Sequence, residues 1–217
     1  MNQQDVIQRT ADFVRQRLSK DSSGHDWWHI DRVRNLALAL GRQEGADLFV
    51  VELAALLHDI ADWKFHDGDL EAGPREAAAW LESCDVEQRV IDQVSQIIGS
   101  LSFKGAGVPT LMTTLAGQVV QDADRLDALG TIGIARAFAY GGSEHREMHN
   151  PETSPKQHES VAQYRRSEST TINHFHEKLL LLAERMNTDT ARRLAGERQA
   201  YMESFLERFA AEWEGRS

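Results

Sequence analysis

Apolar residues recur every three or four positions along most of this chain, which is the period of an amphipathic helix. The spacing predicts helices over residues 3–19, 26–44, 47–60, 86–98, 126–140, 157–186 and 189–213. No stretch of useful length alternates between polar and apolar residues in the way that a half-buried strand requires. The pattern therefore predicts an all-α fold.

Capping residues mark several of the expected helix ends. Gly45 suits the C′ position after the second helix, and Asp47 is a good N-cap for the third. Pro74 suits the first position of a further helix, which continues through residues 77–81. Gly99 is expected to stop the helix that precedes it.

The segment over about residues 141–156 is polar and contains two glycines and two prolines. Such segments usually run over the surface, so we expect a mobile loop and a candidate lid. A length of 217 residues fits a single domain over 1–217. The C-terminal helices, over about 157–213, could close the helical bundle or form a homodimer interface.

Composition narrows the classes of partner. Lys and Arg total 24 against 34 Asp and Glu, a formal net charge of −10, which argues against a non-specific grip on a nucleic acid polymer. A single cysteine, Cys84, permits no internal disulfide and fits a reducing compartment. The chain starts without a signal-peptide pattern, and no apolar run approaches the ~18 residues of a membrane span. We therefore expect a cytoplasmic protein without a membrane partner.

The chemistry centres on His58 and Asp59, which directly follow the apolar run over residues 49–57. Burying either side chain without a partner would cost a few kcal/mol. A divalent cation suits both side chains at once, because neutral imidazole and carboxylate are common ligands of transition metals.

Further candidate ligands come from two other segments. His25 and His29 lie four residues apart, on one face of the second helix, and Asp124 follows a buried apolar stretch. His25 alone would be explained as a hydrogen-bonded histidine. The set of His29, the adjacent pair and Asp124 favours a metal, because otherwise each costly burial needs a separate explanation.

Two more acids lie near Asp124. Asp122 and Asp127 are expected to cap a helix, to support a ligand or to form a salt bridge, rather than to bind the ion themselves.

These residues stand within ordered strings: GHDWWHIDRV at 24–33, HDIAD at 58–62 and QDADRLDALG at 121–130. Together they resemble the H…HD…D signature of the HD-domain metal-dependent phosphohydrolases. The strings ARAFAYGG at 135–142 and HFHEKLL at 174–180 resemble a bacterial subgroup of small stand-alone HD hydrolases. The resemblance covers about residues 5–213.

The resemblance implies an all-helical HD fold in which His29, His58, Asp59 and Asp124 hold a divalent metal. Nitrogen and carboxylate ligands without thiolate suit Mn²⁺, Co²⁺, Ni²⁺, Fe²⁺ or Mg²⁺, and the ligand set does not select among them. Members with two metals need extra histidines before the final aspartate. After His66 no histidine occurs until residue 145, which predicts a single metal ion.

Residues around this set are candidates for catalysis and substrate binding. Asp62, three positions after the HD aspartate, is expected to orient or deprotonate the attacking water, unless it is an exposed acid at a helix end. His25 could contact a phosphate, protonate a leaving oxygen or orient a metal ligand. Lys64 and Lys104 are candidates for binding phosphate, with solvated surface lysines as the alternative.

The leading function is hydrolysis of a small phosphorylated metabolite, with a nucleotide as the favoured substrate. Within that class we favour nucleoside triphosphate pyrophosphohydrolysis, by attack of an activated water on phosphorus. Hydrolysis of an alarmone or of a nucleoside monophosphate is the alternative reaction. A non-catalytic nucleotide-binding HD module is the alternative from a different functional class.

Overall fold

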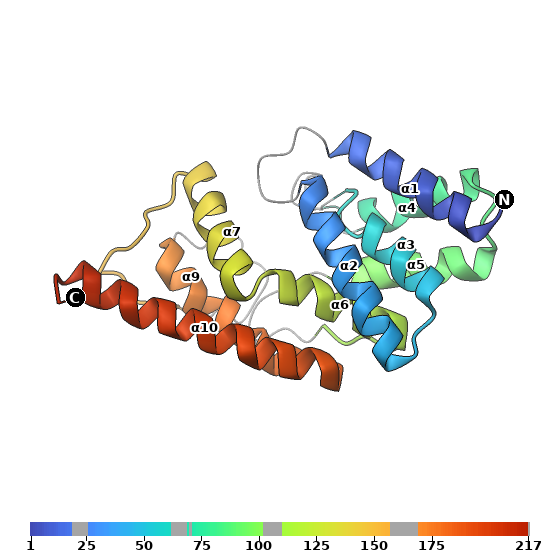
Figure 1. The fold of residues 1–217 in the computed structure, drawn as a ribbon. Helices are drawn as coiled ribbons and strands as arrows, with labels where there is room; N and C mark the ends of the chain where they lie inside the picture. Colours follow the sequence, from blue (N-terminus) through green and yellow to red (C-terminus); the bar gives the residue numbers. More distant parts are fainter. Residues whose placement is uncertain (19–25, 62–68, 70, 102–109, 157–168, 217) are drawn as a thin grey trace. The chain divides into compact units, whose positions relative to one another are not determined.

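The computed structural model describes residues 1–18, 26–61, 69, 71–101, 110–156 and 169–216 (Figure 1). Regular structure in these ranges is helical, without a strand, which confirms the predicted all-α fold. The chain divides into two compact units, residues 1–103 with 110–123 and residues 104–109 with 124–217. Within the described ranges, no helix combines the length and the apolar character that crossing a membrane requires.

The first unit is built around α3 (Leu48–Leu57), a short helix that is apolar on nearly all sides. Seven of its ten residues are buried, so neighbouring helices must cover it all round. It contacts α1, α2 and α5. The other helices of this unit are α1 (Gln3–Arg17), α2 (Trp27–Glu44), α4 (Ala72–Ser83), α5 (Gln88–Leu101) and the first part of α6 (Leu115–Asp127).

The connection between α2 and α3 is confirmed as predicted. Gly45 ends α2 in the left-handed conformation, with φ of 74°, where a residue without a β-carbon is favoured. The Asp47 side chain then accepts hydrogen bonds from the Phe49 and Val50 amides at the start of α3. A connection this short makes α2 and α3 an antiparallel helical hairpin.

Three predicted helix ends in this unit are wrong. α3 ends at Leu57 rather than at residue 60, so the two residues that follow lie in a turn. α4 begins at Ala72, which places Pro74 third in the helix, within the first turn, where amides have no helical partner anyway. α5 continues past Gly99, and a β-carbon there would meet the Pro74 ring at 3.4 Å. This glycine therefore lies inside α5, beside α4, and does not end the helix.

The second unit contains the end of α6, followed by α7 (Gly130–Ser143), α9 (Thr171–Glu177) and α10 (Asp189–Trp213). The predicted helix over 126–140 is wrong at its start, because α6 continues to Asp127 and the break falls just after it. Gly130 makes that break with φ of 70°. A β-carbon on it would meet the side chain of Arg198 at 3.1 Å. Burial lowers the pKa of Arg198, and its guanidinium donates to the Leu126 carbonyl.

In the described part of the long helix predicted over 157–186, the α-helix α9 covers only Thr171–Glu177. Residues 157–168 lie outside the described ranges, and α9 is followed by two single turns of 3₁₀ helix, Leu179–Leu181 and Ala183–Arg185. The predicted break before the last helix is confirmed, since Thr188 caps α10 by accepting from the Ala191 amide.

The segment over residues 144–156, which follows α7, is hydrogen-bonded to α9. The Thr171 and Ile172 amides donate to the Glu147 and Met148 carbonyls at 2.9 and 3.0 Å. The Asn173 side-chain amide donates to the Thr153 carbonyl at 2.8 Å. A movement of this segment would have to break these bonds, and its role as a lid stays a prediction.

Candidate metal centre

His29 enters the site from the first turn of α2. Asp26 caps this helix, and its side chain accepts a hydrogen bond from the His29 amide at 3.0 Å. The cap fixes where the helix begins and therefore which residues lie on its buried face. The imidazole of His29 is fully buried, as are the side chains of Ile30 and Val33 on the same helix.

His58 enters from the turn that ends α3. Its Nδ1 lies 2.8 Å from the Ala55 carbonyl oxygen, so Nδ1 must carry the proton that is donated. Ala55 is in the last turn of the helix, where carbonyls lack regular helical partners. In a neutral ring this hydrogen bond leaves the lone pair on Nε2, the tautomer that a metal ligand requires.

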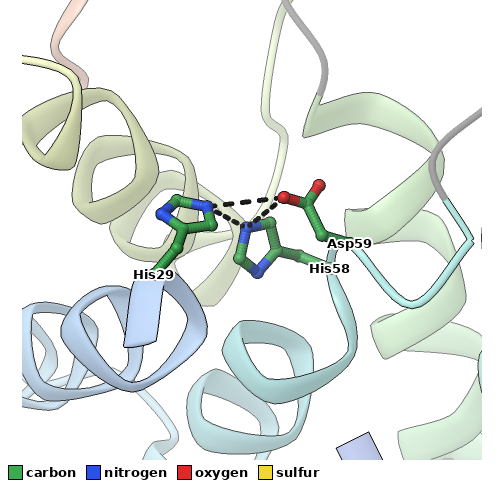
Figure 2. Close-up of side chains that lie close together, drawn as sticks. All are labelled: His29, His58 and Asp59. Atoms are coloured by element: carbon green, nitrogen blue, oxygen red, sulfur yellow. Dashed lines mark hydrogen bonds and ion pairs between the residues drawn. The ribbon is translucent and has the colours of Figure 1, made fainter. Parts of the chain in front are cut away.

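The two histidines and Asp59 bring their donor atoms together (Figure 2). The His29 and His58 Nε2 atoms lie 3.2 Å apart, and Asp59 Oδ2 lies 3.4 Å from the first and 3.5 Å from the second. In the part of the chain that the structure describes, these are the residues whose donor atoms could share an ion, all within 4.8 Å of one another.

These separations fit one shared cation. Ligand atoms about 2.1 Å from one ion are about 3.0 Å apart at a right angle and about 3.4 Å apart at the tetrahedral angle. The exposed fractions of the side chains are 0% for His29, 2% for His58 and 17% for Asp59. The carboxylate therefore lies on the solvent side of the cluster, and the imidazoles form its buried floor.

The structure does not test the other predicted site residues. Asp124 lies half-buried in the last turn of α6, and its role as a ligand stays a prediction. His25, Asp62, Lys64 and Lys104 lie outside the described residues.

The two additional acids of α6 are both buried. Asp127 forms an ion pair with Arg136 of α7 at 2.7 Å, which confirms one of the roles expected for it. The sequence did not indicate its partner, because the break between α6 and α7 was predicted in the wrong place. Two supports of the cluster were also missed. One is the Ala55 carbonyl, a backbone group without a sequence signal, and the other is the cap at Asp26.

Comparison with known proteins agrees with this arrangement. The HD-domain family model matches residues 27–129, which include both histidines and the aspartate of the cluster. The uncharacterized protein YpgQ of Bacillus subtilis is 40% identical over 195 residues, which cover 89% of this chain and 87% of YpgQ. The chain belongs to the HD-domain family.

Solved structures extend the likeness of this HD protein over nearly its full length. A Lactobacillus plantarum protein is 39% identical with a TM-score of 0.88, covering 99% of this chain and 100% of that one. An HD-superfamily hydrolase of Bacillus thuringiensis is 43% identical, with a TM-score of 0.75 and coverage of 98% and 99%. YpgQ in complex with ADP is 37% identical, with a TM-score of 0.74 and coverage of 95% and 100%. The resemblance to small stand-alone bacterial HD hydrolases is thus confirmed.

Proposed function

We propose that this HD hydrolase is a metal-dependent phosphohydrolase that acts on a small phosphorylated metabolite, with a nucleotide as its favoured substrate. The observation that carries the proposal is the convergence of two imidazole nitrogens and a carboxylate oxygen within 4.8 Å. The hydrogen bond from His58 Nδ1 to Ala55 supports it, since it turns a lone pair toward the cluster.

His29, His58 and Asp59 would hold one divalent ion, with Asp124 as the predicted fourth ligand. Such an ion, when bound, lowers the pKa of a coordinated water and polarises a phosphoryl oxygen. The buried imidazoles hold the floor of the site and exclude water from that side. The 17% exposed carboxylate of Asp59 marks the side from which substrate would enter.

The remaining roles follow from the sequence. Asp62 would orient or deprotonate the attacking water, because it comes three residues after Asp59. His25 would contact a phosphate, protonate a leaving oxygen or orient a metal ligand. Lys64 and Lys104 would offset the charge of the phosphate groups.

A nucleotide substrate is supported by the crystal structure of YpgQ with ADP, a relative that covers 95% of this chain. We favour release of pyrophosphate from a nucleoside triphosphate. The released products and the cleaved substrate together distinguish this reaction from the alternatives. A monophosphatase releases only orthophosphate. An alarmone hydrolase cleaves only a substrate that carries a second phosphorylated position.

The test is release of phosphate and pyrophosphate from a panel of nucleotides, with Mn²⁺, Co²⁺, Ni²⁺, Fe²⁺ or Mg²⁺ added singly. We expect turnover that a chelator abolishes, that Asp59→Ala removes and that Asp92→Ala leaves unchanged. Asp92 is a suitable control because it is an exposed carboxylate on α5 that accepts a hydrogen bond from Gln88. Bound metal and intact folding without turnover of any nucleotide would contradict the proposed substrate class.

A further inference from the structure

Opposite charges face each other across the α2–α3 hairpin, outside the set of candidate metal ligands. Arg34 of α2 donates to one carboxylate oxygen of Glu52, on α3, through Nε at 2.8 Å and a terminal nitrogen at 2.5 Å. The exposed fractions of the two side chains are only 24% and 12%. Partial burial and two donors from one guanidinium distinguish this pair from a solvated surface ion pair.

The pair lies between two other contacts of the same hairpin. Near the connection between the helices, a β-carbon on Gly41 would meet the Leu48 side chain at 3.0 Å, so the helices are already close there. Beyond the pair, His29 and His58 approach within 3.2 Å. Successive contacts therefore join α2 to α3 in antiparallel register, and the ion pair is the middle one.

The distance from the ion pair to the ligands is short. Arg34 comes five residues after His29, and Glu52 comes six residues before His58. At about 1.5 Å of rise per helical residue, each charge lies roughly 8–9 Å along its helix from a metal-binding imidazole. A small slide of α2 along α3 would thus change the spacing of the two Nε2 atoms directly.

An ion pair resists such a slide better than apolar contacts do. Other residues of the two helices are aliphatic and buried, among them Val33 and Ala37 of α2 and Val51 of α3, and apolar burial is non-directional, so it opposes a small shift only weakly. A guanidinium that donates twice to one oxygen loses both bonds when the helices slide, and its half-buried charge then lacks that partner. Ligand constellations need donor atoms held within about 0.5 Å.

We propose that Arg34 and Glu52 are positioning residues of the metal centre, which set the spacing between the imidazoles of His29 and His58. The inference rests on the proposed function, in which both imidazoles bind one ion. It assigns the ion pair a role in metal affinity that differs from simple stabilisation of the fold.

The test is titration of the purified full chain with Co²⁺, measured by calorimetry and by visible absorption of the bound ion, beside denaturant unfolding of the metal-free protein. We expect Arg34→Gln and Glu52→Gln each to weaken Co²⁺ binding about 10-fold and to change the absorption spectrum, as loss of groups that orient ligands does. Arg34→Lys keeps the charge but loses the double donor, so it should fall between the wild type and Arg34→Gln.

A matched control is available in the same unit. Arg17 of α1 and Glu76 of α4 form an ion pair at 2.8 Å, with exposed fractions of 45% and 33%. Arg17→Gln removes the same chemistry and should leave Co²⁺ affinity and the spectrum unchanged.

Two results would overturn the inference, and they can be told apart. If the wild type binds Co²⁺ and Arg34→Gln binds it equally well with an unchanged spectrum, the ion pair only stabilises the fold and the inference is wrong. If the wild type binds no Co²⁺ at all, the proposed function fails, and this inference fails with it.

Discussion

A carboxylate lies at or just after the end of both α3 and α6, and the two carboxylates face different partners. Asp59 lies two residues after the end of α3 with 17% of its side chain exposed, and Asp127 is the buried last residue of α6. The Asp127 carboxylate faces the guanidinium of Arg136 at 2.7 Å, so the protein itself supplies the opposite charge. The Asp59 carboxylate faces two imidazole nitrogens at 3.4 and 3.5 Å, which suit a shared cation.

The comparison teaches how to separate a structural acid from a functional one. A buried carboxylate paired with arginine is satisfied within the fold and serves stability. A carboxylate that converges with the lone-pair nitrogens of histidines forms a donor set for an ion from outside. Substitutions at the two helix ends should therefore have opposite consequences.

The largest effect is expected from Asp59→Ala. Removing one of three converging donors should weaken metal binding by more than about 100-fold, since loss of merely supporting groups already costs 10–100-fold. The free energy of unfolding of the metal-free protein should change by less than about 1 kcal/mol. Calorimetric titration and denaturant unfolding check the two halves. An Asp59→Ala variant that is much less stable but binds metal normally would show that Asp59 stabilises the fold and is not a metal ligand.

Asp127→Asn tests the other helix end. It should lower the free energy of unfolding by about 2 kcal/mol, because the charge of Arg136 loses this partner in a half-buried place. The value is below that for a fully buried pair because the Arg136 side chain is 21% exposed. Denaturant unfolding measures it. Asp189→Asn is the control, since Asp189 pairs with Arg192 at the surface and its loss should cost under about 0.5 kcal/mol. Equal losses from the two variants would contradict the structural role.

Asp47→Ala tests the start of α3, at the opposite end of this helix from the candidate metal ligands. Its side chain accepts from the first amides of this helix, so its loss should lower the free energy of unfolding by about 1 kcal/mol. Metal affinity should stay within about 2-fold, because the donor atoms lie at the opposite end of the helix. Unfolding and Co²⁺ titration of the same preparation test this. A large fall in affinity would show that the start of α3, rather than its turn, controls the donors.

The prediction from sequence succeeded where several local signals agreed. The connection between α2 and α3 has the predicted left-handed Gly45 and the predicted cap at Asp47, and both helix ends beside it were predicted correctly to within one residue. The adjacent histidine and aspartate were recognisable because polar residues directly follow an apolar run.

Prediction failed where a single residue had to be interpreted without its tertiary contacts. Gly99 looks like a helix end but lies inside α5, where Pro74 of the preceding helix, α4, is 3.4 Å from its β-carbon position. Gly130 falls inside the predicted helix over 126–140 but makes the break between α6 and α7. The ion pair of Arg34 and Glu52 could have been found by pairing positions across the connection, which requires the antiparallel register to be known first.

The measurement that tests the central claim most directly is anomalous scattering from crystals of the protein grown with Mn²⁺. The account predicts one peak within about 2.0–2.3 Å of His29 Nε2, His58 Nε2 and an Asp59 carboxylate oxygen. Contact of the same peak with Asp124 would confirm the fourth ligand. A direct hydrogen bond between the two imidazoles with no peak beside it, at saturating Mn²⁺, would contradict the account.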